Sequence, residues 1–233
     1  MTSTTSAGTT AASTDSDSLF ERLGAVWLEL EDHLDKVPIL NRLEAGTVTL
    51  EDYQRLLFNL RQQVIDGSPW IARAASNFDI EHFELRAAAI KHAEEEHRDH
   101  FMLERDYVAI GGSLEELRAG RKNVGSEALS GYLFNYASRP NPAGLLGAMF
   151  IIEGLGERLA GPWSAAISEQ LGLGDEAVSF LAYHGANDGD HLDMFDHALA
   201  LAVTDARVGD EIVRHARIVA RLYRLQLEEI DNV

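Results

Sequence analysis

The chain has 233 residues, of which 45% are hydrophobic and 25% charged, as in folded proteins that bury a core. Its 38 acidic and 20 basic residues give a formal net charge of −18, which disfavours nucleic acids and anionic membrane surfaces as partners. Because cysteine is absent, the sequence excludes disulfide bonds, a thiolate nucleophile and cysteine-ligated metals, so any metal must be held by histidine and carboxylate groups.

The N-terminal segment, residues 1–18, consists almost entirely of Thr, Ser, Ala, Gly and Asp. It has neither the basic region nor the apolar region of a secretory signal peptide. We expect a disordered tail, because the segment has too little apolar surface to offset the entropy lost on ordering. The remainder, residues 19–233, is expected to form a single domain. No apolar run reaches the roughly 18–20 residues of a membrane helix, so we expect no membrane association and a cytoplasmic location.

Beyond this tail, apolar residues recur at the spacing of an α-helix. A first helix is predicted behind Asp17 and Ser18, which suit an N-cap, and it ends before a turn at residues 44–46. Thr49 opens a second helix, and the sequence Gly67-Ser68-Pro69 breaks or kinks it.

The helical pattern continues to the C-terminus. A third helix is predicted over residues 81–110, where Gly111 and Gly112 end it. Strand-like alternation is nowhere convincing. We therefore predict an all-α bundle of about seven helices. The remaining four are expected at about residues 129–136, 143–171, 175–203 and 205–230.

The strongest local signal for chemistry is the set His184, Asp188 and His191. Residues at i, i+4 and i+7 of a helix fall within about 60° of one another, because each residue advances about 100°. The stripe lies between the apolar pairs 180–181 and 194–195, so we expect it to face the interior. Two imidazoles and a carboxylate suit iron, manganese or zinc. A solvated polar helix face is an equally open interpretation.

A second signal is Glu153, which lies within the apolar stretch 145–156. A buried carboxylate is costly unless it is paired, protonated or bound to a metal. Pairing with Arg158 or with the backbone is the alternative to metal binding.

The third signal is the polar run from His92 to His100, whose inward face is ambiguous. If His100 points inward, Glu96 lies on the same side, whereas an inward His97 selects Glu94 instead. Some of these residues belong to a solvated charge run, but at least two can face inward as a His/carboxylate pair.

Together, these three helices supply six candidate ligands, a normal number for a two-metal carboxylate site in a helical bundle. The ferritin-like pattern is disfavoured, because Gly156 stands where a second Glu-x-x-His motif needs histidine. The predicted ligands are Glu96, His100, Glu153, His184, Asp188 and His191, with Glu94, Glu95 and His97 in reserve.

At these residues the chain resembles the heme-oxygenase-like diiron oxidases and oxygenases, which share a fold with TenA thiaminases and the pyrroloquinoline-quinone synthase. Members of this family have a Glu…His pair on one helix, a lone Glu on another and His-x3-Asp-x2-His on a third. The last motif is complete from His184 to His191, and Glu153 precedes it by 31 residues. The stretch from His100 to Gly112 resembles the family's ligand histidine and the helix that follows it.

The resemblance implies a heme-oxygenase-like bundle with its site between core helices. It implies two Fe(II) per chain and O2 as co-substrate, acting on a small amine, amino acid or fatty-acid-like molecule. N-oxygenation and C–H or C–C oxidation are the expected reactions. A homodimer and an external electron donor are the further expected partners.

Other functions remain open at this point. A heme-binding oxygenase or a metal-free member of the same fold would use the same scaffold, although the thiaminase branch needs a cysteine that this chain lacks. A non-catalytic helical interaction protein is a third class. Weak candidates for substrate contacts, for which ordinary core packing is the alternative, are Tyr53, Trp70, Met149, Arg158 and Tyr183.

Overall fold

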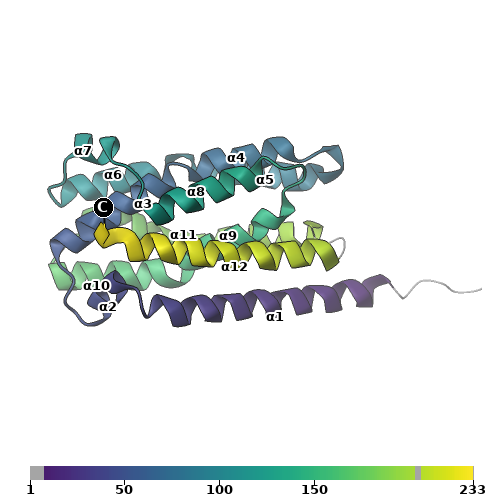
Figure 1. Cartoon of the computed structure of the whole chain (residues 1–233), viewed down its shortest axis with the longest axis horizontal. Coiled ribbons are helices and arrows are strands. Elements are labelled where there is room, and N and C mark those ends of the chain that lie inside the picture. Colours follow the sequence, from purple (N-terminus) through teal and green to yellow (C-terminus); the bar gives the residue numbers. More distant parts are fainter. Residues whose placement is uncertain (1–7, 203–205, 233) are drawn as a thin grey trace, which may run out of the picture.

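The computed structural model describes residues 8–202 and 206–232, and for residues 8–17, 188–194, 196 and 206 only the backbone is described. Every regular element in these ranges is helical, which confirms the all-α prediction. In Figure 1, α4, α5 and α8 lie along the upper side of the bundle and α1 and α10 along the lower side, with α9, α11 and α12 between them. None of the described helices is both long and apolar enough to cross a membrane.

The α-helices of the described ranges are α1 (Gly8–Leu34), α2 (Pro38–Glu44), α3 (Leu50–Val64), α4 (Gly67–Asn77), α5 (Phe83–Glu95), α6 (His100–Ala109), α7 (Leu114–Ala119), α8 (Val124–Ala137), α9 (Leu146–Leu155), α10 (Gly161–Leu171), α11 (Ser179–Ala202) and α12 (Ala206–Glu228). Single helical turns join several of them: η1 (Ile80–His82), η2 (Glu96–Arg98), η3 (Ala143–Leu145), η4 (Gly156–Ala160), η5 (Asp175–Ala177) and η6 (Glu229–Asn232). Of these turns, η4 is a π-helix and the others are 3-10 helices.

The helices follow the predicted order but are more interrupted than the periodicity indicated. The helix expected over 81–110 is divided by η2, and the one expected over 143–171 contains the π-helical turn η4. The short helices α2 and α7 were not predicted, because seven and six residues carry too little periodic signal. Helix α1 begins at Gly8, inside the segment expected to be a tail, so the expected domain division stays a prediction.

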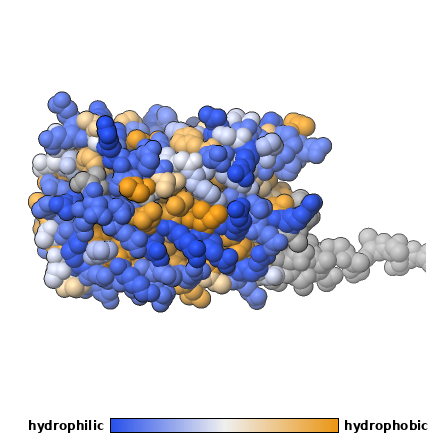
Figure 2. Space-filling view, in the orientation of Figure 1, coloured by the Kyte–Doolittle hydropathy of each residue, from blue (hydrophilic) through white to orange (hydrophobic). Residues whose placement is uncertain are grey.

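The most apolar of the helices, α9, lies at the centre of the core. It contacts α1, α11 and α12, and Ala148, Ile151 and Leu155 on it are buried. A side chain at Gly147 would collide with the backbone carbonyl of Ile212, so glycine permits the close packing of α9 against α12. Polar residues cover most of the face seen in Figure 2, with hydrophobic residues gathered in a band across its middle.

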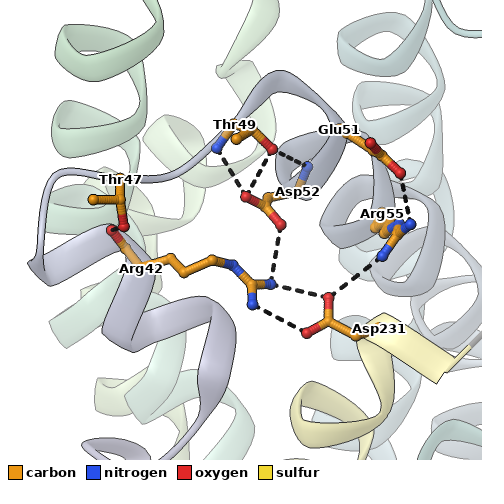
Figure 3. Close-up of polar contacts among 7 residues, drawn as sticks. All are labelled: Arg42, Thr47, Thr49, Glu51, Asp52, Arg55 and Asp231. Carbon is orange, nitrogen blue, oxygen red and sulfur yellow. Dashed lines mark hydrogen bonds and ion pairs between the residues drawn. The ribbon is translucent and has the colours of Figure 1, made fainter.

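An ion-pair network holds the C-terminal turn against the start of α3 (Figure 3). Thr49 and Asp52 form a capping box, in which each side chain accepts a hydrogen bond from the other residue's backbone N–H. Arg42 Nη2 lies 3.0 Å from Asp52 Oδ1 and 2.9 Å from Asp231 Oδ1. Arg55 Nη1 approaches Asp231 Oδ1 at 3.6 Å. These contacts join α2, α3 and η6 at one end of the bundle.

The first turn of α11 is fixed by a buried carboxylate from another helix. Asp106 on α6 accepts a hydrogen bond from the Phe180 backbone N–H at 2.8 Å and another from the Ser179 hydroxyl at 2.5 Å. The Tyr53 hydroxyl donates to the carbonyl of Ala177 just before this helix, at 2.7 Å. Backbone N–H groups at a helix start have no partner within the helix, so Asp106 satisfies groups that would otherwise be buried unpaired.

We therefore expect Asp106→Ala to lower the free energy of unfolding by about 1–2 kcal/mol, as the loss of a helix cap does. Asp106→Asn keeps an acceptor oxygen and serves as the control, with a smaller expected loss. Urea unfolding followed by circular dichroism measures both. An Asp106→Ala protein with the wild-type urea midpoint would show that the start of α11 does not depend on this carboxylate.

Candidate metal centre

Five ionisable side chains meet in the interior where α5, α9 and α11 approach one another. We call His92, Glu96, Asp99, Glu153 and His184 the core cluster. His92 belongs to α5, Glu96 opens the turn η2, Asp99 precedes α6, Glu153 belongs to α9 and His184 to α11. Segments far apart in the sequence thus contribute to one polar site.

Three residues of the core cluster have ligand atoms close enough to share a metal ion. One ligand atom each from His92, Glu96 and Glu153 lie within 4.8 Å of one another. Among these atoms, His92 Nε2 lies 3.2 Å from Glu153 Oε1. A second contact joins His184 Nε2 to Asp99 Oδ2 at 3.4 Å. Imidazole nitrogens and carboxylate oxygens together are the donors that iron, manganese and zinc accept.

The core cluster is buried and rich in negative charge. His92 is 1% exposed and Glu153 5% exposed, and Asp99 and His184 are also buried. Burial is the largest of the effects that raise the pKa of Glu96 to about 8; the charges of Glu153 and Asp99 act in the same direction, and His92 and His184 oppose them. Buried carboxylates that repel one another beside imidazole nitrogens are stabilised by a divalent cation. The residues present therefore fit a metal ion.

Local breaks in helical geometry accompany the core cluster. The 3-10 turn η2 separates α5 from α6 at Glu96, and the π-helical turn η4 begins three residues after Glu153. Such turns within longer helical segments often mark functional sites. A side chain at Gly185 would collide with the backbone of Gly161, so glycine next to His184 lets α11 approach the end of η4.

A cavity of about 80 Å³ lies against the core cluster. Glu96, Glu153 and His184 line it on the polar side. Much of the remaining wall is apolar and includes Trp70 and Phe180. The cavity gives a small molecule access to three of the five cluster residues.

Three of the six predicted ligands, Glu96, Glu153 and His184, come together in the core cluster. Asp188 and His191 belong to α11, but their side chains lie outside the described part of the structure. The structure does not bring His100 into the group. Its imidazole is half-buried against the ring of Phe101, with 4.1 Å between ring centroids.

The electrostatic environment of His100 also differs from that of the core cluster. Burial lowers the pKa of His100, and the neighbouring charges that act on it are Glu104, Arg61, His97 and Arg118. None of these four residues belongs to the core cluster. His100 therefore lies on the side of Glu104 and its two arginines, which pair with that carboxylate at 2.5–3.2 Å.

The reserve candidates lie at the surface. Glu94 and Glu95 are exposed, and Glu95 pairs with Lys91 at 3.3 Å. His97 is exposed as well, with its Nδ1 3.5 Å from the Ser68 hydroxyl oxygen. Of the three consecutive glutamates, Glu96 is the one in the core cluster.

The predicted substrate contacts have different environments. Trp70 lines the 80 Å³ cavity. Tyr53 is fully buried, with its hydroxyl bonded to Ala177, and Met149 lines a separate apolar cavity. Arg158 lies over the ring of Trp27 at 4.6 Å, and Tyr183 is 45% exposed, with its ring perpendicular to that of His184.

The sequence prediction missed His92 and Asp99. His92, Glu96 and Asp99 stand at i, i+4 and i+7, the same spacing as His184, Asp188 and His191. A search for that repeated spacing in the polar run would have selected both residues.

Comparison with known proteins places this geometry in a family. The sequence pattern of a family described as iron-containing redox enzyme matches residues 64–224. No curated protein sequence matches the chain.

Solved structures share the fold at low sequence identity. A domain of unknown function with a heme oxygenase-like fold from Shewanella denitrificans superimposes with a TM-score of 0.84 at 19% identity, covering 90% of each chain. A TenA homolog from Pseudomonas syringae pathovar tomato gives 0.73 at 14% identity, covering 92% of this chain and 93% of its own. A TenA family transcription regulator from a Silicibacter species gives 0.60 at 14% identity, covering 88% and 96%.

These likenesses confirm the predicted heme-oxygenase-like fold, and the family match covers more than half of the chain. With its buried cluster of histidine and carboxylate ligands, the chain belongs to the iron-containing redox enzymes of heme-oxygenase-like fold.

Proposed function

We propose that the protein is a nonheme diiron oxidase or oxygenase that uses O2. The observation that carries this proposal is the convergence of His92, Glu96 and Glu153 on one buried point, with ligand atoms within 4.8 Å of one another. His184 and Asp99 lie beside them. Iron bound by these groups would supply the activation of O2, chemistry that side chains alone do not perform.

The proposed ligands are divided between two parts of the site. His92, Glu96 and Glu153 would hold one iron, and His184 would contribute to a second. Asp188 and His191, one and two turns after His184 on α11, are the predicted ligands that complete the second position. Six mixed nitrogen and oxygen ligands suit two metal ions.

The remaining residues orient ligands and exclude water. Asp99 Oδ2 lies 3.4 Å from His184 Nε2, and a carboxylate beside a ligand imidazole orients its ring. Trp70 and Phe180 form apolar walls beside Glu153, which keep bulk water away from the oxidising centre. In the metal-free protein, Glu96 holds a proton that it must release before it binds a metal.

The cavity lined by Glu96, Glu153 and His184 is the proposed substrate site. Its volume of about 80 Å³ suits a small molecule, and Gln63 and Tyr223 add polar groups to a mostly apolar wall. A small amine, amino acid or fatty-acid-like molecule is the proposed substrate class, oxidised at nitrogen or at a C–H or C–C bond.

Anaerobic Fe(II) titration tests the proposal. We expect the wild-type protein to bind about two equivalents of iron per chain. Glu153→Ala should lose one or both while keeping its helical circular dichroism, because alanine is the better helix former. The control is Glu157→Ala, one turn further along in η4 and outside the core cluster, which should bind iron like the wild type.

A Glu153→Ala protein that binds two irons and reacts with O2 as the wild type does would refute the proposed site. A strong heme absorption band in the isolated protein would instead favour the heme-binding alternative.

The raised pKa of Glu96 predicts how the metal-free protein responds to pH. In the folded state this carboxyl has a pKa of about 8, above the roughly 4.3 of an unperturbed glutamate. Between these values the folded state binds a proton that the unfolded state has released. The free energy of unfolding should therefore decrease as the pH rises from about 5 to 8.

Two measurements check this expectation. In urea unfolding at several pH values, the free energy of unfolding should depend less on pH for Glu96→Gln than for the wild type. The control is Glu94→Gln at an exposed position, which should show the wild-type dependence. The affinity for Mn(II) should rise with pH up to about 8, roughly tenfold per unit for each proton released. A flat affinity over this range would exclude Glu96 as a ligand.

A further inference from the structure

A second cavity, of about 40 Å³, lies on another side of the core cluster. Residues from α4, α5, α9 and α11 and the turn η3 line it. His92 is the one ionisable residue among the described residues that line this cavity. We call it the His92 cavity, and the larger one the substrate cavity.

The lining of the His92 cavity disfavours water. An internal water needs about two to four polar partners, whereas apolar cavities stay dry and bind small apolar molecules such as xenon. Most of the wall consists of apolar side chains such as Phe78, Leu85 and Leu146. Its volume of about 40 Å³ exceeds the roughly 10–15 Å³ that a cavity needs to hold one water-sized molecule, so it has room for a diatomic molecule.

Alanines create much of this space. Ala74 on α4, Ala89 on α5 and Ala198 on α11 line the cavity from three sides. A longer side chain at any of these positions would extend into the cavity, because interiors are otherwise close-packed. Replacing one of these alanines by a larger residue therefore tests whether the cavity binds a ligand.

The two cavities are adjacent, because they share wall residues and both adjoin the core cluster. Trp70 and Ile71 line both of them and so lie between them. His92, on the apolar side, is 3.2 Å from Glu153, which lines the substrate cavity. An apolar molecule beside His92 would thus be next to the core cluster without occupying the substrate cavity.

We propose that the His92 cavity is a binding site for dioxygen, separate from the substrate cavity and adjoining the core cluster. This proposal rests on the proposed function, which requires O2 to reach iron while a substrate fills the other cavity. Dioxygen matches the site because it is apolar, diatomic and uncharged. The cavity raises the local concentration of O2 beside the metal ligands, since apolar solutes leave water for apolar surroundings.

Xenon is the probe for the site itself. We expect crystals of the metal-free, full-length protein pressurised with xenon to show one xenon atom between Ala89, His92 and Met149. Ala89→Leu should remove it, because the added side chain fills the cavity. The matched control is Ala87→Leu on the same helix, at an exposed position outside both cavities, which should bind xenon as the wild type does.

Oxygen kinetics test the function of the site. After Fe(II) loading, stopped-flow measurements over a range of O2 concentrations should show a several-fold lower second-order rate constant for Ala89→Leu. Iron content should be unchanged, and Ala87→Leu should react at the wild-type rate.

The outcomes separate this proposal from the proposed function. Iron binding with no xenon in the wild-type cavity would overturn the dioxygen site alone. An Ala89→Leu protein that loses xenon but reacts with O2 at the wild-type rate would do the same. Xenon binding in a protein that binds no iron would overturn the proposed function and, with it, the assignment of dioxygen as the ligand.

Discussion

The clustering of three carboxylates with two imidazoles between α5, α9 and α11 is the constraint on which the rest of the structure depends, and four of these five side chains are buried. Removing a carboxylate from water costs several kcal/mol unless a partner compensates its charge. Here the acidic groups repel one another as well, and a proton on Glu96 relieves that repulsion in the metal-free protein. Divalent cations would replace this proton and neutralise more charge. The interior thus suits a bound cation better than it suits the stability of the metal-free chain.

Presenting these groups from separate helices requires departures from regular geometry. The turn η2 ends α5 at Glu96, and the π-helical turn η4 follows Glu153 before α10 begins. The glycine contact between α11 and the end of η4 permits a helix spacing that a larger residue would prevent. Asp106 fixes the first turn of α11 before His184, and the contact of Gly185 with Gly161 fixes the helix just after it.

The sequence was sufficient to predict the helical class, the fold and three of the five residues of the core cluster. Glu153 could be found because a lone carboxylate in an apolar helix is costly, and His184 because its stripe has apolar neighbours on both sides. Periodicity also recovered the long helices in order. Periodicity could not detect the single turns η2 and η4, because one 3-10 or π-helical turn changes the spacing of only a few apolar residues.

The same turn explains why His100 was selected and His92 missed. The prediction that His100 shares a face with Glu96 assumed a continuous α-helix, in which each residue advances about 100°. A 3-10 helix has about three residues per turn, so each residue of η2 advances about 120° and rotates the following helix. His92 precedes this turn, and its α-helical relation to Glu96 is preserved. A polar run gives no apolar pattern against which such a shift can be recognised.

The solved structures with this fold include a TenA homolog at 14% identity, so the bundle alone does not determine the chemistry. Function has to be argued from the polar residues of the interior. In the proposed enzyme the core cluster fixes the metal, and the apolar His92 cavity is suited to a molecule as simple as O2. Neither of them recognises a particular organic molecule. Substrate choice must then lie in the other walls of the larger cavity, where Gln63 and Tyr223 are among the few polar side chains beyond the metal ligands.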